Sequence, residues 1–172
     1  MHPSMTGRFL RIACLSALSA LLMCSAVDAA QPPAPSRKDT TPLNVLNQPL
    51  QSCSKAPLTG YLRNGACEVG DDDAGVHGVC AVMNARFLAF TKSQGNDLTT
   101  PNPGTRFPGL KPGEHWCVCA GRWQQALDAG VAPKVVLKAT SKQVLNSLFL
   151  DDLARHAIDP PKRLPEQPMP SR

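Results

Sequence analysis

The stretch GEHWCVCAGRW, residues 113–123, predicts a β-strand followed by a helix more clearly than any other part of the chain. Tryptophan, valine and alanine alternate with Cys117 and Cys119, and a period of two is typical of a strand. Arg122 and the residues after it predict a short helix, which ends at Gly130. The two cysteines are therefore expected on one face of a strand, next to the start of a helix.

The segments on either side of this stretch extend the predicted fold. Residues 79–93 place Cys80 and three other apolar side chains at helical spacing, so we expect a helix with Cys80 in its first turn, on the inward face. Residues 135–137 predict a second strand, and the order strand, helix, strand indicates a parallel pair joined by a crossover. Asn64 and Gly65 suit the tight type I′ turn of a β-hairpin.

Two further helices are expected near the end of the fold, over residues 143–148 and 153–157, with Ser141 and Asp151 as their caps. Together these elements predict the α+β class, with a small mixed sheet, a β-hairpin and three or four helices. We expect a single compact domain over residues 43–159.

The two ends of the chain differ in composition from this domain. Residues 1–30 combine an early positive charge, an apolar run and small residues near Ala30, which is the form of a secretory signal peptide. Residues 31–42 and 160–172 are rich in proline and predict disordered arms. The protein is therefore expected in the periplasm or secreted, with no stable membrane span once the signal is removed; a retained membrane anchor is the alternative.

Removal of a signal peptide would also change the set of cysteines. It would remove Cys14 and Cys24, although Cys24 could instead be the modified residue of a lipoprotein. In an oxidising compartment, where disulfides persist, five of the seven cysteines would remain: Cys53, Cys67, Cys80, Cys117 and Cys119. At most two intramolecular bridges can form, so one thiol must stay free, bind a metal or pair with another chain.

Charge and composition exclude some partners. The net charge of +5 is mild, and the basic residues are not interleaved with aromatic residues, so we expect no nucleic-acid partner. The acidic stretch Asp71, Asp72 and Asp73 lacks the spaced oxygen ligands of a calcium loop and is interpreted as an exposed loop before a helix. No other partner or substrate is indicated.

Several motifs occur together in one known family. PLTGY, HGVCA, GNDLTTP, FPGLKPG and WCVCAGRW, in this order, resemble a small bacterial family catalogued as domain of unknown function 2237. The resemblance implies a compact domain whose fold does not depend on disulfides, and it implies no established activity, cofactor or catalytic residue. Two features depart from the family's pattern: Ser141 stands where a histidine often follows the residue matching Thr140, and the signal peptide and proline-rich arms are additions.

The cysteines and one histidine suggest the sharpest functional hypothesis. His77 and Cys80 form an H-x-x-C pair, and Cys117 and Cys119 form C-x-C on a strand. If the strand packs against the helix, these four side chains could hold zinc or copper(I), because thiolate and imidazole suit such metals. We interpret the protein as a binding protein whose Cys/His cluster holds a soft metal or acts as a redox-sensitive thiol site, with the cofactor unknown.

Two other functions remain open. In a thiol-dependent enzyme, Cys80 would be the nucleophile and His77 its base. In a disulfide-stabilised structural or partner-binding module, two bridges would form and one thiol would stay buried and inert. A bond between Cys117 and Cys119 would be strained, because residues two apart on a strand have Cα atoms about 6.8 Å apart. Bridges from either of them to the other cysteines are more plausible, and the pairing stays open.

The long loop of residues 95–113 carries a second polar cluster: Asn96, Asp97, Thr99 and Thr100. Loops of this length are often functional, so the cluster is interpreted either as a ligand loop or as local caps and turns. The remaining candidates are interpreted as structural: His115, His156, Trp116 and Trp123.

Overall fold

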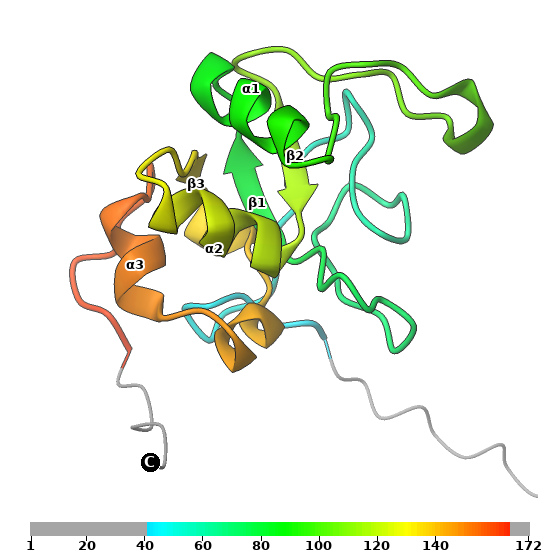
Figure 1. The fold of residues 1–172 in the computed structure, drawn as a ribbon. Helices are drawn as coiled ribbons and strands as arrows, with labels where there is room; N and C mark the ends of the chain where they lie inside the picture. Colours follow the sequence, from blue (N-terminus) through cyan, green and yellow to red (C-terminus); the bar gives the residue numbers. More distant parts are fainter. Residues whose placement is uncertain (1–40, 166–172) are drawn as a thin grey trace, which may run out of the picture. The chain divides into compact units, whose positions relative to one another are not determined.

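The computed structural model describes residues 41–165, and Figure 1 shows their arrangement. The expected signal peptide, residues 1–30, lies outside the described residues, as do residues 31–40 of the first proline-rich arm and residues 166–172 of the second. No helix among residues 41–165 has the length and the apolar character that a membrane crossing requires.

A small sheet lies at the centre of the described chain. Strand β2, His115–Val118, and strand β3, Lys134–Val135, lie on opposite sides of strand β1, Val79–Val82, and both pair with it antiparallel (Figure 1). Cys80 faces Cys117 across the β1–β2 pair. Since successive side chains of a strand point to opposite faces, these two cysteines share one face of the sheet.

Helices and short 3₁₀ turns accompany the sheet. The α-helices of the described chain are α1, Ala85–Ser93, α2, Ala120–Asp128, and α3, Leu150–Arg155. Helix α1 begins after Asn84, whose side-chain oxygen accepts a hydrogen bond of 2.9 Å from the Phe87 N–H group. The 3₁₀ turns are η1, Pro103–Thr105, η2, Leu137–Ala139, and η3, Lys142–Asn146.

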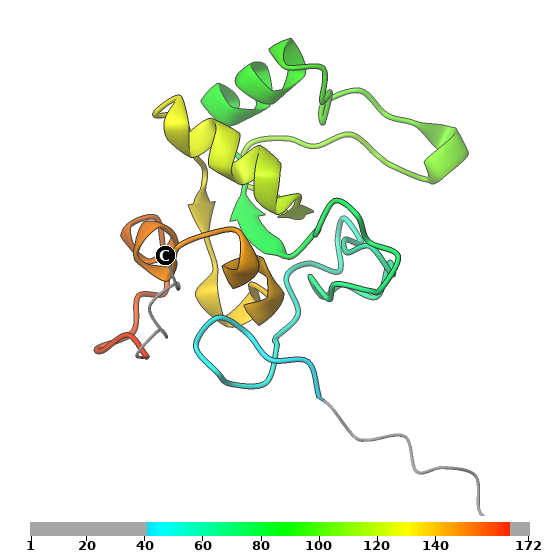
Figure 2. The ribbon, with the colours of Figure 1, turned by 60° about the horizontal axis from the view of Figure 1, so that its bottom comes forward.

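The two faces of the sheet have different coverings. Helices α1 and α2 lie side by side on one face (Figure 2), and the part of the chain that carries Cys53 and Cys67 packs against the other. The main apolar core lies on the helix side and includes the fully buried Trp123 and Phe87. A second, smaller core on the opposite face has these buried members: Cys53, Cys67, Cys80, Cys117 and Ala139. The sheet thus separates an ordinary apolar core from one made almost entirely of cysteines.

The α+β class is confirmed, but the helix predicted over residues 79–93 is wrong in its first part. Residues 79–82 form β1, and α1 begins only at Ala85. Cys80 therefore lies on a strand and not in the first turn of a helix. The run VCAV is short and apolar throughout, so its periodicity does not distinguish a buried strand from a helix. The end of the helix is as expected, with Gly95 at a φ of 79° just beyond it.

The pairing of the strands also differs from the expected crossover. Strands β2 and β3 flank α2 and run in the same direction, but β1 lies between them and pairs with both. The three strands therefore form an antiparallel sheet and not a mixed one. A parallel contact occurs only as the isolated bridge between Val135 and Ala157, within the described chain.

The turn at Asn64 and Gly65 does not close a two-residue hairpin. Arg63 and Gly65, with φ of 53° and 88°, are the residues of this turn in the left-handed region. Ala66 pairs with Ser52 in an isolated bridge. The chain after this turn therefore pairs with the extended segment around Ser52, and not with the residues just before the turn.

Helical elements form where the last two helices are predicted, but their bounds differ and one of them is a 3₁₀ helix. Ser141 accepts a hydrogen bond of 3.3 Å from the Gln143 N–H group, as expected of a cap, but the element that follows is the 3₁₀ helix η3. Asp151 lies inside the first turn of α3, and Phe149 is its N-cap residue. A carboxylate in the first turn still suits the positive end of the helix.

Candidate thiol site

The site begins in the turn before β1, where Asp73 holds His77. One carboxylate oxygen of Asp73, Oδ2, accepts a hydrogen bond of 2.7 Å from the backbone N–H group of His77. The other, Oδ1, lies 2.6 Å from Nδ1 of the imidazole, and the Asp73 side chain is fully buried. A single carboxylate thus fixes both the backbone and the ring of the histidine, and the rest of the ring is left for another partner.

Cys119 provides that partner from a different element. It follows β2 and is the N-cap residue of α2. The N–H group of Ala120 donates a hydrogen bond of 3.0 Å to the carbonyl of Val76, which joins the start of α2 to the turn that carries His77. The side chain of Cys119 lies beside the imidazole of His77, and both lie against Gly75. The site therefore consists of Asp73, His77 and Cys119, in which the histidine contacts both of the other side chains. We refer to it as the thiol site.

Close packing keeps the thiol and the imidazole in place. A Cβ atom at Gly75 would lie 2.7 Å from Cε1 of His77 and 3.3 Å from Sγ of Cys119, so only glycine fits there without displacing the ring. The next residue, Val76, has a φ of 49°, which is rare for a β-branched residue. Backbone of this kind clusters at functional sites, where the surrounding structure imposes it.

The electrostatics of the thiol site favour a charged histidine. The hydrogen bond with Cys119 has the largest effect and raises the pKa of His77; burial lowers it, and the hydrogen bond and charge of Asp73 raise it. The pKa of His77 is about 9, compared with an ordinary value of 6.5. The imidazole therefore carries a proton at neutral pH, and its positive charge lies beside Cys119.

The start of α2 adds a second source of positive potential. The carbonyl of Cys119 accepts hydrogen bonds of 3.0 Å from the N–H groups of both Arg122 and Trp123. Among residues 41–165, none accepts a hydrogen bond from the Gly121 N–H group. This N–H group, two residues from Cys119 in the first turn of a helix, can stabilise negative charge that develops next to the sulfur.

A pocket of about 290 Å³ opens beside His77. The ring of Tyr61 stacks on the imidazole, with 5.9 Å between centroids and 20° between planes. Trp116 forms another part of the wall; Phe107 meets it edge to face at 5.2 Å, and Cζ of Arg63 lies 5.0 Å from its ring centroid. The pocket thus offers aromatic surface and the charged Arg63 next to His77.

Two disulfides join the segment of residues 41–78 to the sheet. Cys53 bonds to Cys80 of β1, and Cys67 bonds to Cys117 of β2. Cys119 is half-buried and is the free thiol of the described chain. Since the histidine and the thiol of the site come from the two parts that the disulfides join, the bridges also stabilise the site.

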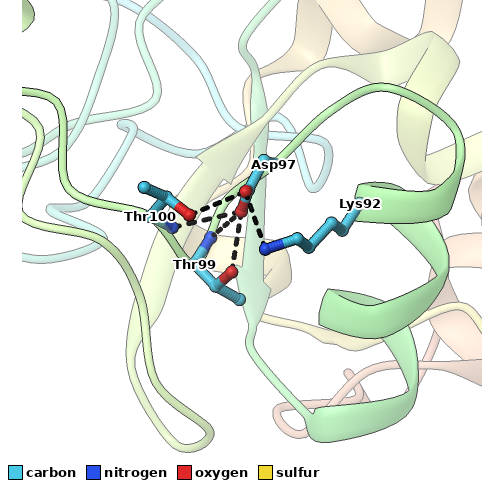
Figure 3. A network of polar contacts seen from close by, with 4 residues as sticks. All are labelled: Lys92, Asp97, Thr99 and Thr100. Carbon is cyan, nitrogen blue, oxygen red and sulfur yellow. Dashed lines mark hydrogen bonds and ion pairs between the residues drawn. The ribbon is translucent and has the colours of Figure 1, made fainter.

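The polar cluster of the loop between α1 and β2 is a local network (Figure 3). The Asp97 carboxylate accepts hydrogen bonds of 2.7 to 3.1 Å from the hydroxyl and backbone N–H groups of Thr99 and Thr100, and it lies 2.9 Å from Nζ of Lys92. These groups, the Thr99 hydroxyl foremost, hold the pKa of Asp97 well below its ordinary value. Asn96 bonds to α1 instead. The network favours the interpretation of this cluster as local turns.

The structure brings together two of the four residues predicted as metal ligands. His77 contacts Cys119, whereas the sulfurs of Cys80 and Cys117 are held in the two disulfides. A bonded sulfur is neither a metal ligand nor a nucleophile, so this oxidised form favours the disulfide-stabilised module over the metal site. The assignment of zinc or copper to these four residues stays a prediction. The expected two bridges and one further thiol are found within residues 41–165.

Sequence reasoning pairs His77 with Cys80 and misses two features of the thiol site. It assigns Asp73 to an exposed loop, whereas this side chain is buried against His77. It also does not pair Cys119 with His77, because the two residues are 42 positions apart in the chain. The spacing of four residues between Asp73 and His77 is the available signal, and many unrelated pairs have it.

The tryptophan and histidine near the end of the fold have structural contacts. Nε1 of Trp123 donates a hydrogen bond of 3.3 Å to the carbonyl of Pro133. The rings of Trp123 and His156 meet edge to face, with 5.5 Å between centroids. Nδ1 of His156 lies 2.9 Å from the carbonyl oxygen of Asp152. These contacts fit the packing roles expected for both residues.

Comparison with known proteins identifies a family that the chain matches. A family model described as "Uncharacterized protein conserved in bacteria (DUF2237)" matches residues 43–157. No curated protein matches the chain. The matched range contains the thiol site, both disulfides and all the named strands and helices of the described chain.

Proposed function

Because the chain belongs to the DUF2237 family of bacterial proteins, whose description assigns no activity, we propose a function from the site itself: a thiol-dependent enzyme in a disulfide-stabilised domain. Cys119 is the nucleophile, His77 is the acid and base, and Asp73 orients the histidine. The reaction class that fits these roles is acyl transfer to water or to another acceptor.

One observation carries this proposal. A buried carboxylate is hydrogen-bonded to an imidazole, a thiol lies beside the same imidazole, and the pKa of the imidazole is raised to about 9. A nucleophile, a base that contacts it and a third group that orients the base are the recurrent parts of such enzymes. The position of Cys119 at the start of a helix supports the same assignment, since the positive end of a helix favours a thiolate.

The proposed reaction has two steps. The Cys119 thiolate attacks the carbonyl carbon of an ester, thioester or amide, a C–S bond forms, and the leaving group departs with the proton of the His77 imidazolium. Water then attacks the thioester, His77 takes a proton from it, and the C–S bond breaks to release the acid and the thiolate. The free N–H group of Gly121 suits the oxyanion of both steps.

The pocket beside His77 supports a substrate with an apolar, planar portion. Tyr61, Phe107 and Trp116 supply aromatic surface, and Arg63 supplies a positive charge at one wall. A pocket of about 290 Å³ holds a small group and not a long chain.

We also propose that the protein works outside the cytoplasm. Two disulfides are typical of proteins in oxidising compartments, and they agree with the signal peptide predicted from residues 1–30. Fractionation of bacterial cells that produce the protein, with sequencing of its mature N-terminus, tests this. A start near residue 31 in the periplasm or medium is expected, and an intact cytoplasmic chain would oppose it.

The function is tested by the reactivity of Cys119. The exported protein is treated with iodoacetamide at pH 7 under non-reducing conditions, and peptide mapping follows the modification of each cysteine. We expect labelling of native Cys119 at least about tenfold faster than in His77→Gln. An activated aryl acetate should release a burst of one equivalent of phenol, which Cys119→Ser abolishes. Labelling that requires denaturation, or equal rates in both proteins, would refute the proposal.

A further inference from the structure

The four cysteines of the two disulfides form a single cluster. The Sγ atoms of Cys53, Cys67 and Cys117 lie within 4.8 Å of one another, so the two bridges are in contact. The sulfurs of Cys53 and Cys80 also lie within 4.8 Å of a ring nitrogen of His115. All four cysteines are buried, with between 0% and 9% of their surface exposed.

Backbone pairing brings these cysteines together independently of the S–S bonds. Cys80 and Cys117 are directly opposite each other in the β1–β2 pair, on one face of the sheet. The segment that carries the other two is paired with itself: Ser52 bridges Ala66, and the Cys53 N–H group donates a hydrogen bond of 2.7 Å to the Gly65 carbonyl.

Two threonine side chains connect strands β1 and β2 to other segments of the chain by hydrogen bonds. The hydroxyl of Thr59 accepts a hydrogen bond of 2.9 Å from the Cys117 N–H group, and that of Thr140 accepts one of 3.1 Å from the Cys80 N–H group. Both threonines are fully buried. The strands and the segment of residues 41–78 therefore have contacts that survive reduction of the disulfides, and the four thiols would stay close together.

We propose that the two disulfides are the oxidised form of a metal site in which Cys53, Cys67, Cys80 and Cys117 bind one zinc ion or another soft cation as four thiolates. Zn–S distances of about 2.3 Å place the sulfurs of a tetrahedral site roughly 3.8 Å apart. Three of the sulfurs already lie within 4.8 Å of one another, and the fourth, that of Cys80, is bonded to Cys53 and needs to move towards the other two. A closed set of four thiolates without access for water is typical of structural zinc.

The two states interconvert with balanced chemistry. Two equivalents of a dithiol reductant supply four electrons, both S–S bonds break, and four thiols form. Binding of one zinc ion then releases up to four protons, because the ligands are thiolates. Oxidation of the bound form by two equivalents of an added disulfide or other two-electron oxidant removes four electrons, restores both bridges and releases the metal.

This ligand set differs from the one expected from the sequence alone. It keeps Cys80 and Cys117 but replaces His77 and Cys119, which belong to the thiol site, by two cysteines of the preceding segment. The inference therefore does not rest on the proposed enzymatic function, and Cys119 becomes a control residue.

The test uses the full chain with Cys14 and Cys24 replaced by serine, so that only the five described cysteines remain. The protein is reduced without oxygen, and cobalt(II) or zinc(II) is added in steps. We expect one metal ion per chain by native mass spectrometry, and the thiolate charge-transfer and tetrahedral d–d bands of cobalt. The oxidised protein should bind none.

Variants separate the possible ligand sets. Cys119→Ser and His77→Gln should keep the affinity for zinc within about threefold, whereas Cys53→Ser and Cys67→Ser should each lower it by more than about tenfold. Binding unchanged in His115→Ala supports four thiolates, and its loss would overturn that ligand set. If the reduced chain unfolds, zinc should restore its circular dichroism spectrum. A reduced chain that binds no zinc, or binding that Cys119→Ser removes, would overturn the proposal.

Discussion

Nδ1 of His77 lies 2.6 Å from Oδ1 of Asp73, a carboxylate with no exposed surface. The same carboxylate accepts the backbone N–H group of the histidine, so the ring has one orientation and one protonated nitrogen at this contact. The same ring also meets Cys119 at the start of α2. A thiol on one element is thus controlled by a carboxylate on another, through a single histidine.

Replacement of Asp73 tests this control. In Asp73→Asn the amide oxygen can still accept the His77 N–H group, but a neutral side chain no longer stabilises the imidazolium. We expect alkylation of Cys119 by iodoacetamide at pH 7 to slow by about tenfold. Asp72→Asn, at an exposed neighbouring position, is the matched control and should react like the unmodified protein. Equal slowing in both variants would show that the loss of loop charge, and not this contact, is responsible.

The packing around Gly75 predicts a second way to disturb the thiol site. Gly75→Ala places a methyl group 2.7 Å from Cε1 of His77, so the ring must move. We expect slower alkylation of Cys119 and a stability loss of about 1–3 kcal/mol from overpacking, measured by urea unfolding. Gly70→Ala is the control, because its Cβ atom would make only an ordinary contact, 3.8 Å from the ring of Tyr61. Unchanged reactivity in Gly75→Ala would mean that the position of the ring does not matter.

The charge of His77 predicts a dependence of stability on pH. Its pKa is raised from 6.5 to about 9 in the folded protein, so the folded state binds the proton more tightly than the unfolded state. The stabilisation is fully present below pH 6.5 and is lost as the pH rises through about 9. Urea unfolding between pH 6 and pH 10 should therefore show a decline that is shallower in His77→Gln. Identical profiles would contradict a charged histidine in the folded protein.

The disulfides are expected to stabilise the fold unequally. Cys67–Cys117 joins residues 50 apart and Cys53–Cys80 joins residues 27 apart, so the first restricts the unfolded chain more. Loss of either bridge by paired replacement with alanine should lower the free energy of unfolding by about 3–4 kcal/mol, with the larger loss for the longer loop. Urea unfolding under non-reducing conditions measures both. A negligible loss in both variants would show that backbone pairing alone holds these segments together.

The network around Asp97 is expected to control the loop locally. Asp97→Ala removes the acceptor of Thr99, Thr100 and Lys92 together, so the loop after α1 loses its turn. We expect faster amide hydrogen exchange in residues 97–110, while exchange in β1 stays unchanged. Lys92→Met, which removes only the ion pair, should have a much smaller effect, because exposed ion pairs contribute little. Faster exchange throughout the domain would contradict a local role.

Parts of the fold follow from local sequence signals. The alternation around Cys117 predicts β2, the pattern after it predicts α2, and Gly95 and Ser141 mark a helix end and a cap where the structure has them. The odd number of cysteines left after residue 30 limits the chain to at most two intramolecular bridges and leaves at least one further cysteine, as the structure has it. These features depend on neighbouring residues or on counting, which is why the sequence alone is sufficient for them.

The sequence by itself determined the α+β class, the family and the residue types from which a site can be made. Only the tertiary structure decided which of these residues meet. Cys80 lies on a strand and not in the predicted helix, because the short apolar run Val79–Val82 is buried in the middle of the sheet. On this strand Cys80 forms a disulfide with Cys53, and His77 contacts Cys119, which is distant from it in the chain. Contacts of this kind depend on how β1 and β2 pair and on where α2 begins, and no local pattern in a single sequence encodes them.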